Sequence, residues 1–108
     1  MGDASKKRCQ NFSIFTGIKE GNELIHRTLL GRATLMQEGD YKVTIGRPHK
    51  KFFSMKKLSD GSAYQVSMVA EVCGVGKVDS TLKTFLELDI LGYPPLFMAL
   101  TPSNEEVA

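Results

Sequence analysis

Residues 41–57 read YKVTIGRPHKKFFSMKK, and the alternation at the start of this stretch decides the fold class. From Tyr41 to Ile45 the odd-numbered positions are apolar and the even-numbered positions are polar. A period of two residues is that of a β-strand with one buried side and one side in solvent. The sequence therefore predicts a strand here, then a basic loop, then a second strand in which the neighbours Phe52 and Phe53 point to opposite sides.

The same period of two recurs further along the chain. Apolar side chains alternate with polar ones in residues 64–72 and 86–90, and short apolar segments stand near both ends, at 11–15 and 96–100. Sequences rich in Gly, Asn, Asp and Pro favour tight turns. Five of them separate these segments: KEGN (19–22), QEGD (37–40), SDGS (59–62), GVGK (74–77) and GYPP (92–95).

Strands joined by short turns pair with their neighbours in sequence, which gives an antiparallel sheet that closes or folds on itself. We therefore predict a mainly β domain: a small antiparallel β-barrel or meander of OB-like type, with six to seven strands and at most one or two short helices. Exposed strand edges in so small a domain are often covered by a second copy, so a homodimer is expected.

Two segments leave the choice between helix and strand open. Residues 23–36 carry apolar side chains at helical spacing, but Gly31 and two threonines favour one long bent strand with Gly31 at a bulge or kink. Residues 79–85 could form a short helix, with Asp79 or Ser80 as its N-terminal cap.

The chain has 108 residues, of which 42% are hydrophobic and 24% charged, values typical of one globular domain. We expect a flexible basic arm at residues 1–10, a single β domain at 11–101 and a short acidic tail at 102–108. The N-terminus lacks the apolar segment of a secretion signal, so a cytoplasmic location is expected and Cys9 and Cys73 are expected to be free thiols.

Charge is divided unevenly along the chain. Residues 1–57 hold twelve Lys and Arg against five Asp and Glu, whereas residues 58–108 hold two against seven. Such a division predicts a positive face on the folded domain, and the usual partner of a positive face is a polyanion.

The most basic stretch, residues 41–57, contains no carboxylate and interleaves its cations with aromatic side chains. Proteins that bind single-stranded nucleic acid combine a basic groove with exposed rings on which bases stack. Alternation with Met55 favours Phe53 buried and Phe52 exposed. The predicted nucleic-acid-binding residues are Tyr41, Lys42, Arg47, Lys50, Lys51, Phe52 and Lys56.

Gly46, Arg47 and Pro48 resemble the core of an AT-hook, a short element that binds the minor groove of duplex DNA. Ile45 stands where that element usually has an arginine, and the surrounding β pattern differs from the disordered tails in which it occurs. The single-strand interpretation is therefore favoured over the duplex one.

Sequence signals for chemistry are absent. Cys9, Cys73, His26 and His49 are scattered, without the paired spacing of a zinc site. The GVGK segment lacks the first glycine and the final hydroxyl of a phosphate-binding loop and is interpreted as a hairpin turn. No histidine accompanies the carboxylates as an acid–base partner, so we expect no enzyme, no cofactor, no metal and no membrane partner.

These observations predict a non-enzymatic, sequence-tolerant protein that binds single-stranded nucleic acid, with DNA favoured over RNA. The alternative is a structural or adaptor β protein that acts through edge-strand or other protein–protein contacts. A small-ligand-binding barrel is a third class, and it would need an apolar cavity that a chain of this size can barely enclose.

Overall fold

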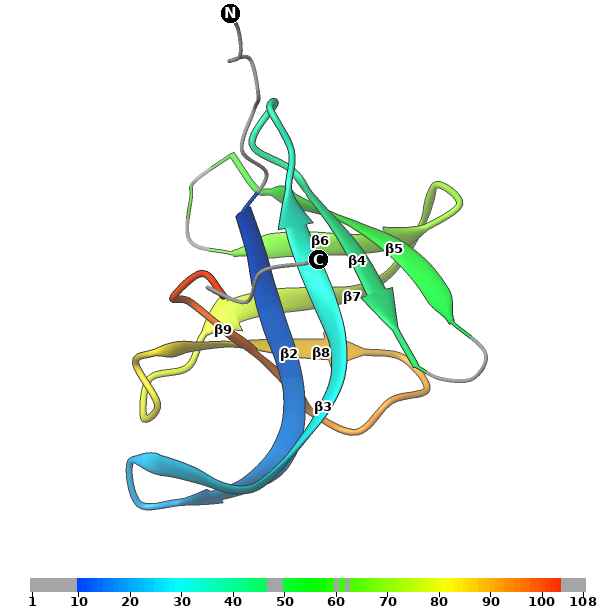
Figure 1. Ribbon diagram of the computed structural model, residues 1–108. Helices are drawn as coiled ribbons and strands as arrows, with labels where there is room; N and C mark the ends of the chain where they lie inside the picture. Colours follow the sequence, from blue (N-terminus) through cyan, green and yellow to red (C-terminus); the bar gives the residue numbers. More distant parts are fainter. Residues whose placement is uncertain (1–9, 47–49, 60, 62, 104–108) are drawn as a thin grey trace, which may run out of the picture.

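The computed structural model describes residues 10–46, 50–59, 61 and 63–103, and these form an antiparallel β structure (Figure 1). None of the described residues is helical, so the described part of the chain contains no helix that could cross a membrane. The strands are β2 (Gln10–Glu20), β3 (Glu23–Leu35), β4 (Tyr41–Ile45), β5 (Lys51–Lys57), β6 (Tyr64–Met68), β7 (Glu71–Val78), β8 (Phe85–Ile90) and β9 (Leu96–Ala99).

The eight strands close into a barrel in which every strand pairs with its neighbour in sequence. Closure comes from β9, which pairs with β2 through Ile14 opposite Met98 and Phe15 opposite Phe97. The predicted small antiparallel barrel is thus confirmed, in its meander form, since an OB-fold has five strands in Greek-key order. The strand count is eight rather than six or seven, and the described part of the chain has none of the short helices allowed for.

The additional strand arises because residues 64–72, predicted as one strand, turn back in the middle. Val69 and Ala70 have positive φ angles of 49° and 67°, the backbone of a two-residue hairpin turn in which Asn-Gly is usual. A β-branched residue in this region is an outlier that costs about 1–3 kcal/mol. The sequence therefore gives no turn signal at the place where β6 ends and β7 begins.

The predicted turn at GVGK is wrong, because these residues lie within β7. Gly74 pairs with Ile90 of β8, and a Cβ atom at Gly74 would lie only 2.5 Å from the carbonyl oxygen of Asp89. The glycine is therefore required by close contact between two strands and not by a turn.

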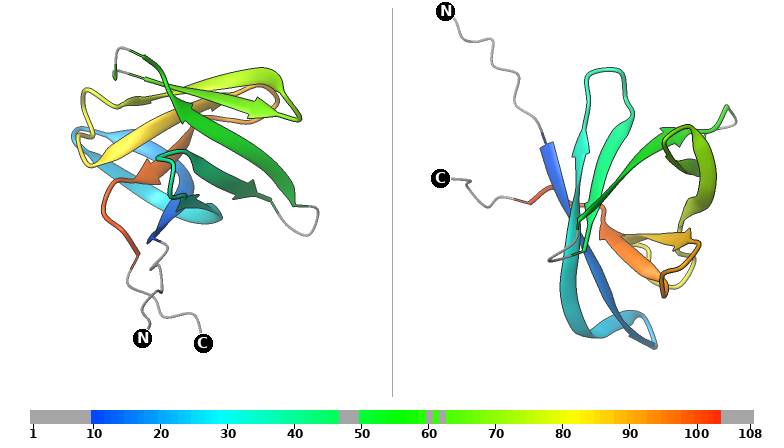
Figure 2. Two further views of the ribbon diagram at one scale, coloured as in Figure 1. Left: turned by 90° about the horizontal axis from the view of Figure 1, so that it is seen from above. Right: turned by 90° about the vertical axis from the view of Figure 1, so that its right-hand side faces the viewer.

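Residues 23–36, for which a helix was the alternative, contain the long strand β3, so the predicted strand is confirmed. Register shifts in its pairing with β2 leave Leu30 as an extra residue directly before Gly31. A Cβ atom at Gly31 would collide with the carbonyl oxygen of Thr44 on β4. Gly31 thus lets β3 bend at a bulge while it stays paired on both sides, and Figure 2 shows the β2–β3 hairpin curling beyond the barrel.

The barrel interior is filled by the inward side chains of seven strands, whereas β7 places Gly74 and Gly76 opposite the inward residues Ile90 and Leu88. Phe53 is buried, with 5% of its surface exposed, and its ring meets Tyr93 edge to face. Burial of each large apolar side chain contributes about 1.5–3 kcal/mol. The buried cluster consists of Phe12, Ile14, Ala33, Val43, Ile45, Phe53, Met55, Val66, Leu86, Leu88, Ile90, Leu96 and Met98.

A second apolar cluster lies on the outer side of β8 and β9. Leu24 of β3 and Leu82 of the β7–β8 turn pack with Phe85 and Phe97, which alternate with inward residues on their strands. Arg27 of β3 lies over the Phe85 ring, 5.5 Å from its centre. The curled β2–β3 hairpin therefore covers an apolar surface that would otherwise face water.

Candidate functional site

Alternation along β3, β4 and β5 brings positively charged side chains to the outer side of the barrel. Inward residues such as Ala33, Val43, Phe53 and Met55 are buried, so the residues between them point outward. We call this outer surface the cationic face. It consists of Arg32, Thr34, Lys42, Thr44, Phe52, Ser54 and Lys56.

The strand register fixes the arrangement of the cationic face. Thr44 stands opposite both Arg32 on β3 and Phe52 on β5, and Lys42 stands opposite Ser54. Lys42 is therefore diagonal to Phe52 and to Lys56, and diagonal neighbours on adjacent strands are about 7–8 Å apart. This separation corresponds to about two nucleotides of a stacked strand, which rises 3.4 Å per nucleotide.

The charged groups of the cationic face are open to water. Arg32, Lys42 and Lys56 are exposed, and in the described part of the chain none of them forms an ion pair with a carboxylate. Asp40, two residues before Lys42 in the β3–β4 turn, is half-buried and is not bonded to it. The positive charges are therefore not neutralised by the described carboxylates.

Phe52 places an aromatic ring among these cations. It is 66% exposed, whereas its neighbour Phe53 is buried, so the predicted orientation of the two rings is confirmed. An exposed ring beside unpaired cations is the combination found where bases stack on a protein surface.

A concavity of about 380 Å³ continues the cationic face toward the bend of β3. Arg32 and Lys50 supply positive charge to its wall, and Leu29 and Leu30 supply apolar surface. Thr44 lines the concavity and also stands next to Phe52, so the hollow and the ring are adjacent. The remaining described wall residues are Gly31, Thr34 and Gly46.

Three of the seven predicted binding residues, Lys42, Phe52 and Lys56, lie together on the cationic face. Lys50 lines the adjoining concavity, and Lys51 is exposed at the first position of β5. Arg47 lies outside the described residues.

Tyr41 lies on the opposite side of β4 from Lys42. Its ring meets those of Phe12 and Tyr64 edge to face, with 5.7 Å between ring centres in each case. The side chain is half-buried, and burial raises the pKa of Tyr41 above its usual value. Tyr41 therefore packs at the edge of the barrel core, away from the cationic face.

Sequence reasoning missed Arg32, which completes the cationic face from β3. Its outward position follows from strand alternation beside buried Ala33. Its place opposite Thr44, which separates it from Phe52 on β5, depends on the register of three strands, which no local sequence signal gives.

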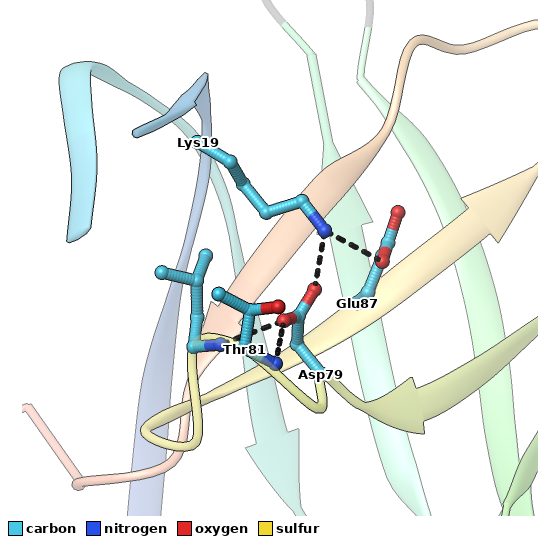
Figure 3. A network of polar contacts seen from close by, with 5 residues as sticks. Lys19, Asp79, Thr81 and Glu87 are labelled. Carbon is cyan, nitrogen blue, oxygen red and sulfur yellow. Dashed lines mark hydrogen bonds and ion pairs between the residues drawn. The ribbon is translucent and has the colours of Figure 1, made fainter. Parts of the chain in front are cut away.

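A separate group of ionisable side chains surrounds Asp79 in the β7–β8 turn (Figure 3). Asp79 is 5% exposed, and its Oδ1 atom accepts hydrogen bonds of 2.7 Å from the backbone N–H groups of Thr81 and Leu82. Its Oδ2 atom accepts a 2.9 Å bond from the Lys19 Nζ group, which also lies 4.0 Å from Glu87. The segment 79–85, for which a short helix was possible, therefore contains a turn that is stabilised by hydrogen bonds to Asp79.

The titration of this group follows from its contacts. The hydrogen bond from the Leu82 N–H group, helped by Lys19 and Thr81, lowers the pKa of Asp79 to about 2 despite its burial. Burial raises the pKa of Glu87, and the bond to Asp79 raises that of Lys19.

The Asp79 group has a structural role. The carboxylate bonds to its own turn and to Lys19, which joins the curled hairpin to the β7–β8 turn. A concavity of about 460 Å³ beside it has walls of both charges, including Lys77 and Asp89. Across the described residues, no three His, Cys, Asp or Glu side chains gather in a way that could hold a metal ion.

Comparison with protein-family models, with curated proteins and with solved structures found no match for this chain.

Proposed function

We propose that this chain is a non-enzymatic protein that binds single-stranded nucleic acid, preferably DNA, with little dependence on sequence. The observation that carries the proposal is that unpaired cations surround a ring that is 66% exposed, all on one outer surface. Cations alone would attract any polyanion, whereas the ring adds a contact specific to bases.

Phosphate contacts would supply most of the affinity. Arg32, Lys42, Lys50 and Lys56 are candidates to contact phosphates, and Lys51 can add a further charge from the start of β5. Each phosphate that a cation neutralises releases counterions, so affinity falls with salt at a slope of about −0.7 per contact on single strands.

The exposed ring favours a single strand over a duplex. Bases in a duplex are stacked on one another, so their faces are closed to a protein ring. The bases of a single strand can stack on Phe52, and each such contact contributes about 1–3 kcal/mol. The hydroxyl groups of Thr44 and Ser54, beside the ring, fit hydrogen bonding to phosphate or sugar without reading sequence.

Closure of the barrel weakens the alternative of an adaptor protein, since that function would depend on open strand edges. Each of the eight strands has a neighbour on both sides, so the barrel offers less free edge than an open sheet would.

Fluorescence anisotropy with a labelled oligo-dT tests the proposal, with a duplex and an oligo-U of equal length as comparisons. Four phosphate contacts would weaken binding about 50-fold between about 50 and 200 mM salt. We expect oligo-dT to bind more tightly than the duplex. Absence of binding to every single strand at low salt would end the proposal.

A further inference from the structure

Exposed apolar side chains lie in a row at the barrel end formed by the β6–β7 and β8–β9 turns. Val69 is 91% exposed, Leu91 83% and Val72 62%. Val72 of β7 pairs with Ser67 of β6, which comes two residues before Val69. The Leu91 N–H group donates a 2.9 Å hydrogen bond to the carbonyl of Cys73, the residue after Val72. We call Val69, Val72 and Leu91 the end patch.

The turn that joins β6 to β7 places an exposed β-branched side chain on a strained backbone. Val69 has a φ angle of 49°, which a β-branched residue rarely adopts, and Ala70 follows at 67°. A side chain that is 91% exposed gains almost nothing from packing within its own chain. Strained non-glycine residues of this kind cluster at functional sites.

Charged side chains lie at both ends of the end patch. Lys50 and Lys51, at the start of β5, are exposed beyond its Val69 end, because β5 is the neighbour of β6 in the barrel. Asp89 of β8, two residues before Leu91, is exposed at the other end, and Glu71 is exposed beside Val72. A two-fold axis through the middle of the patch exchanges its two ends, so it would bring Asp89 of one copy to the lysines of the other.

The exposed area fits a small symmetric interface. The three side chains expose roughly 400 Å² per copy, at the level where an apolar patch on a monomer usually has a function. The end patches of two copies would together bury about 800 Å², and the charged flanks would add to this toward the lower limit of about 1,200 Å² for specific protein–protein interfaces. Insertion into an anionic membrane is disfavoured because Glu71 stands within the same turn.

We propose that the end patch is the contact surface of a two-fold symmetric homodimer of this chain. The partner is a second copy, which supplies both the apolar surface and the complementary charges. The apolar residues of this interface are distinct from the cationic face, whereas Lys50 and Lys51 are shared with the proposed phosphate contacts.

Sedimentation velocity of the full chain between about 1 and 200 μM tests the proposal, because a small interface gives a dissociation constant in the micromolar range. We expect a monomer–dimer equilibrium. Val69→Lys with Leu91→Lys should weaken the dimer at least about tenfold. Val78→Lys, at an apolar position 54% exposed near the other end of β7, is the matched control and should leave the dimer unchanged.

Val69→Asn with Ala70→Gly separates loss of contact from loss of folding. These residues suit the turn, so the variant should melt at a higher temperature and yet dimerise more weakly. A wild-type chain that stays monomeric throughout the range would overturn the proposal. Dimerisation of the Val69→Lys, Leu91→Lys variant as strong as that of the wild type would also overturn it. The same holds if a monomeric wild type binds phosphatidylserine vesicles and the double lysine variant does not.

Discussion

Replacement of Asp79 by Asn should destabilise the fold in a pH-dependent way. The pKa of Asp79 is lowered from 3.8 to about 2, and the side chain is only 2% exposed, so solvent screens its contacts little. A pKa that is almost two units lower in the folded state than in the unfolded state corresponds to about 2.5 kcal/mol of unfolding free energy at neutral pH. Asn keeps an oxygen for the Thr81 and Leu82 N–H groups but loses the charge that attracts Lys19.

The direction of the pH dependence follows from the lowered pKa. Because the folded-state value lies below the unfolded one, the carboxylate stabilises the fold above about pH 4, and this stabilisation is lost as the pH falls from about 4 to 2. Urea unfolding of wild type and Asp79→Asn should therefore differ by about 2 kcal/mol at pH 7. The difference should shrink to a few tenths near pH 2.

Glu38→Gln, at an exposed position in the β3–β4 turn, is the control and should change the unfolding free energy by less than about 0.5 kcal/mol at any pH. A difference between wild type and Asp79→Asn that stays constant from pH 7 to pH 2 would refute the reasoning. An Asp79→Asn effect as small as that of the control would also refute it.

Three further substitutions test individual contacts. Gly31→Ala should lower the unfolding free energy in urea by about 1–3 kcal/mol or more, because the added Cβ atom collides with the Thr44 carbonyl; an unchanged midpoint would contradict this close approach. Phe52→Ala should weaken oligo-dT binding about tenfold and alter urea unfolding by less than about 0.5 kcal/mol, and equal affinity would remove the ring from the proposed site. Arg27→Gln should cost about 0.5–2 kcal/mol in thermal unfolding, since its guanidinium lies over Phe85, and Arg27→Lys should cost less.

Local patterns predicted the fold class because the barrel is built from strands with clear alternation. Phe53 and Met55 are buried and Phe52 is exposed, as a period of two requires. The positions where prediction failed are those where distant contacts decide the backbone. Gly74 looks like a turn residue, yet its glycine is needed because Asp89 of the next strand lies against it.

The candidate site was predicted in part for the same reason. Lys42, Phe52 and Lys56 share a short stretch of sequence, so alternation alone groups them. Arg32 joins them through pairing of β3 with β4, which sequence does not specify. Tyr41 is close to Lys42 in sequence, but its ring packs against Tyr64 because the two meet at the edge of the core.

Sites held together by side-chain networks were the least predictable. Asp79 and Lys19 are 60 residues apart and meet only because the β2–β3 hairpin curls over the outer side of the barrel. The bulges in the β2–β3 pairing accompany this bend, and no turn motif marks them in the sequence.

The salt dependence of oligo-dT affinity in matched charge variants tests the central claim most directly. Lys42→Gln with Lys56→Gln removes two cations from the cationic face, whereas Lys77→Gln with Lys83→Gln removes two exposed cations from β7 and the β7–β8 turn. The first variant should reduce the slope of log affinity against log salt by about 1.4, and the second should leave it unchanged. Equal slopes in both variants and the wild type would show that phosphates do not contact this face.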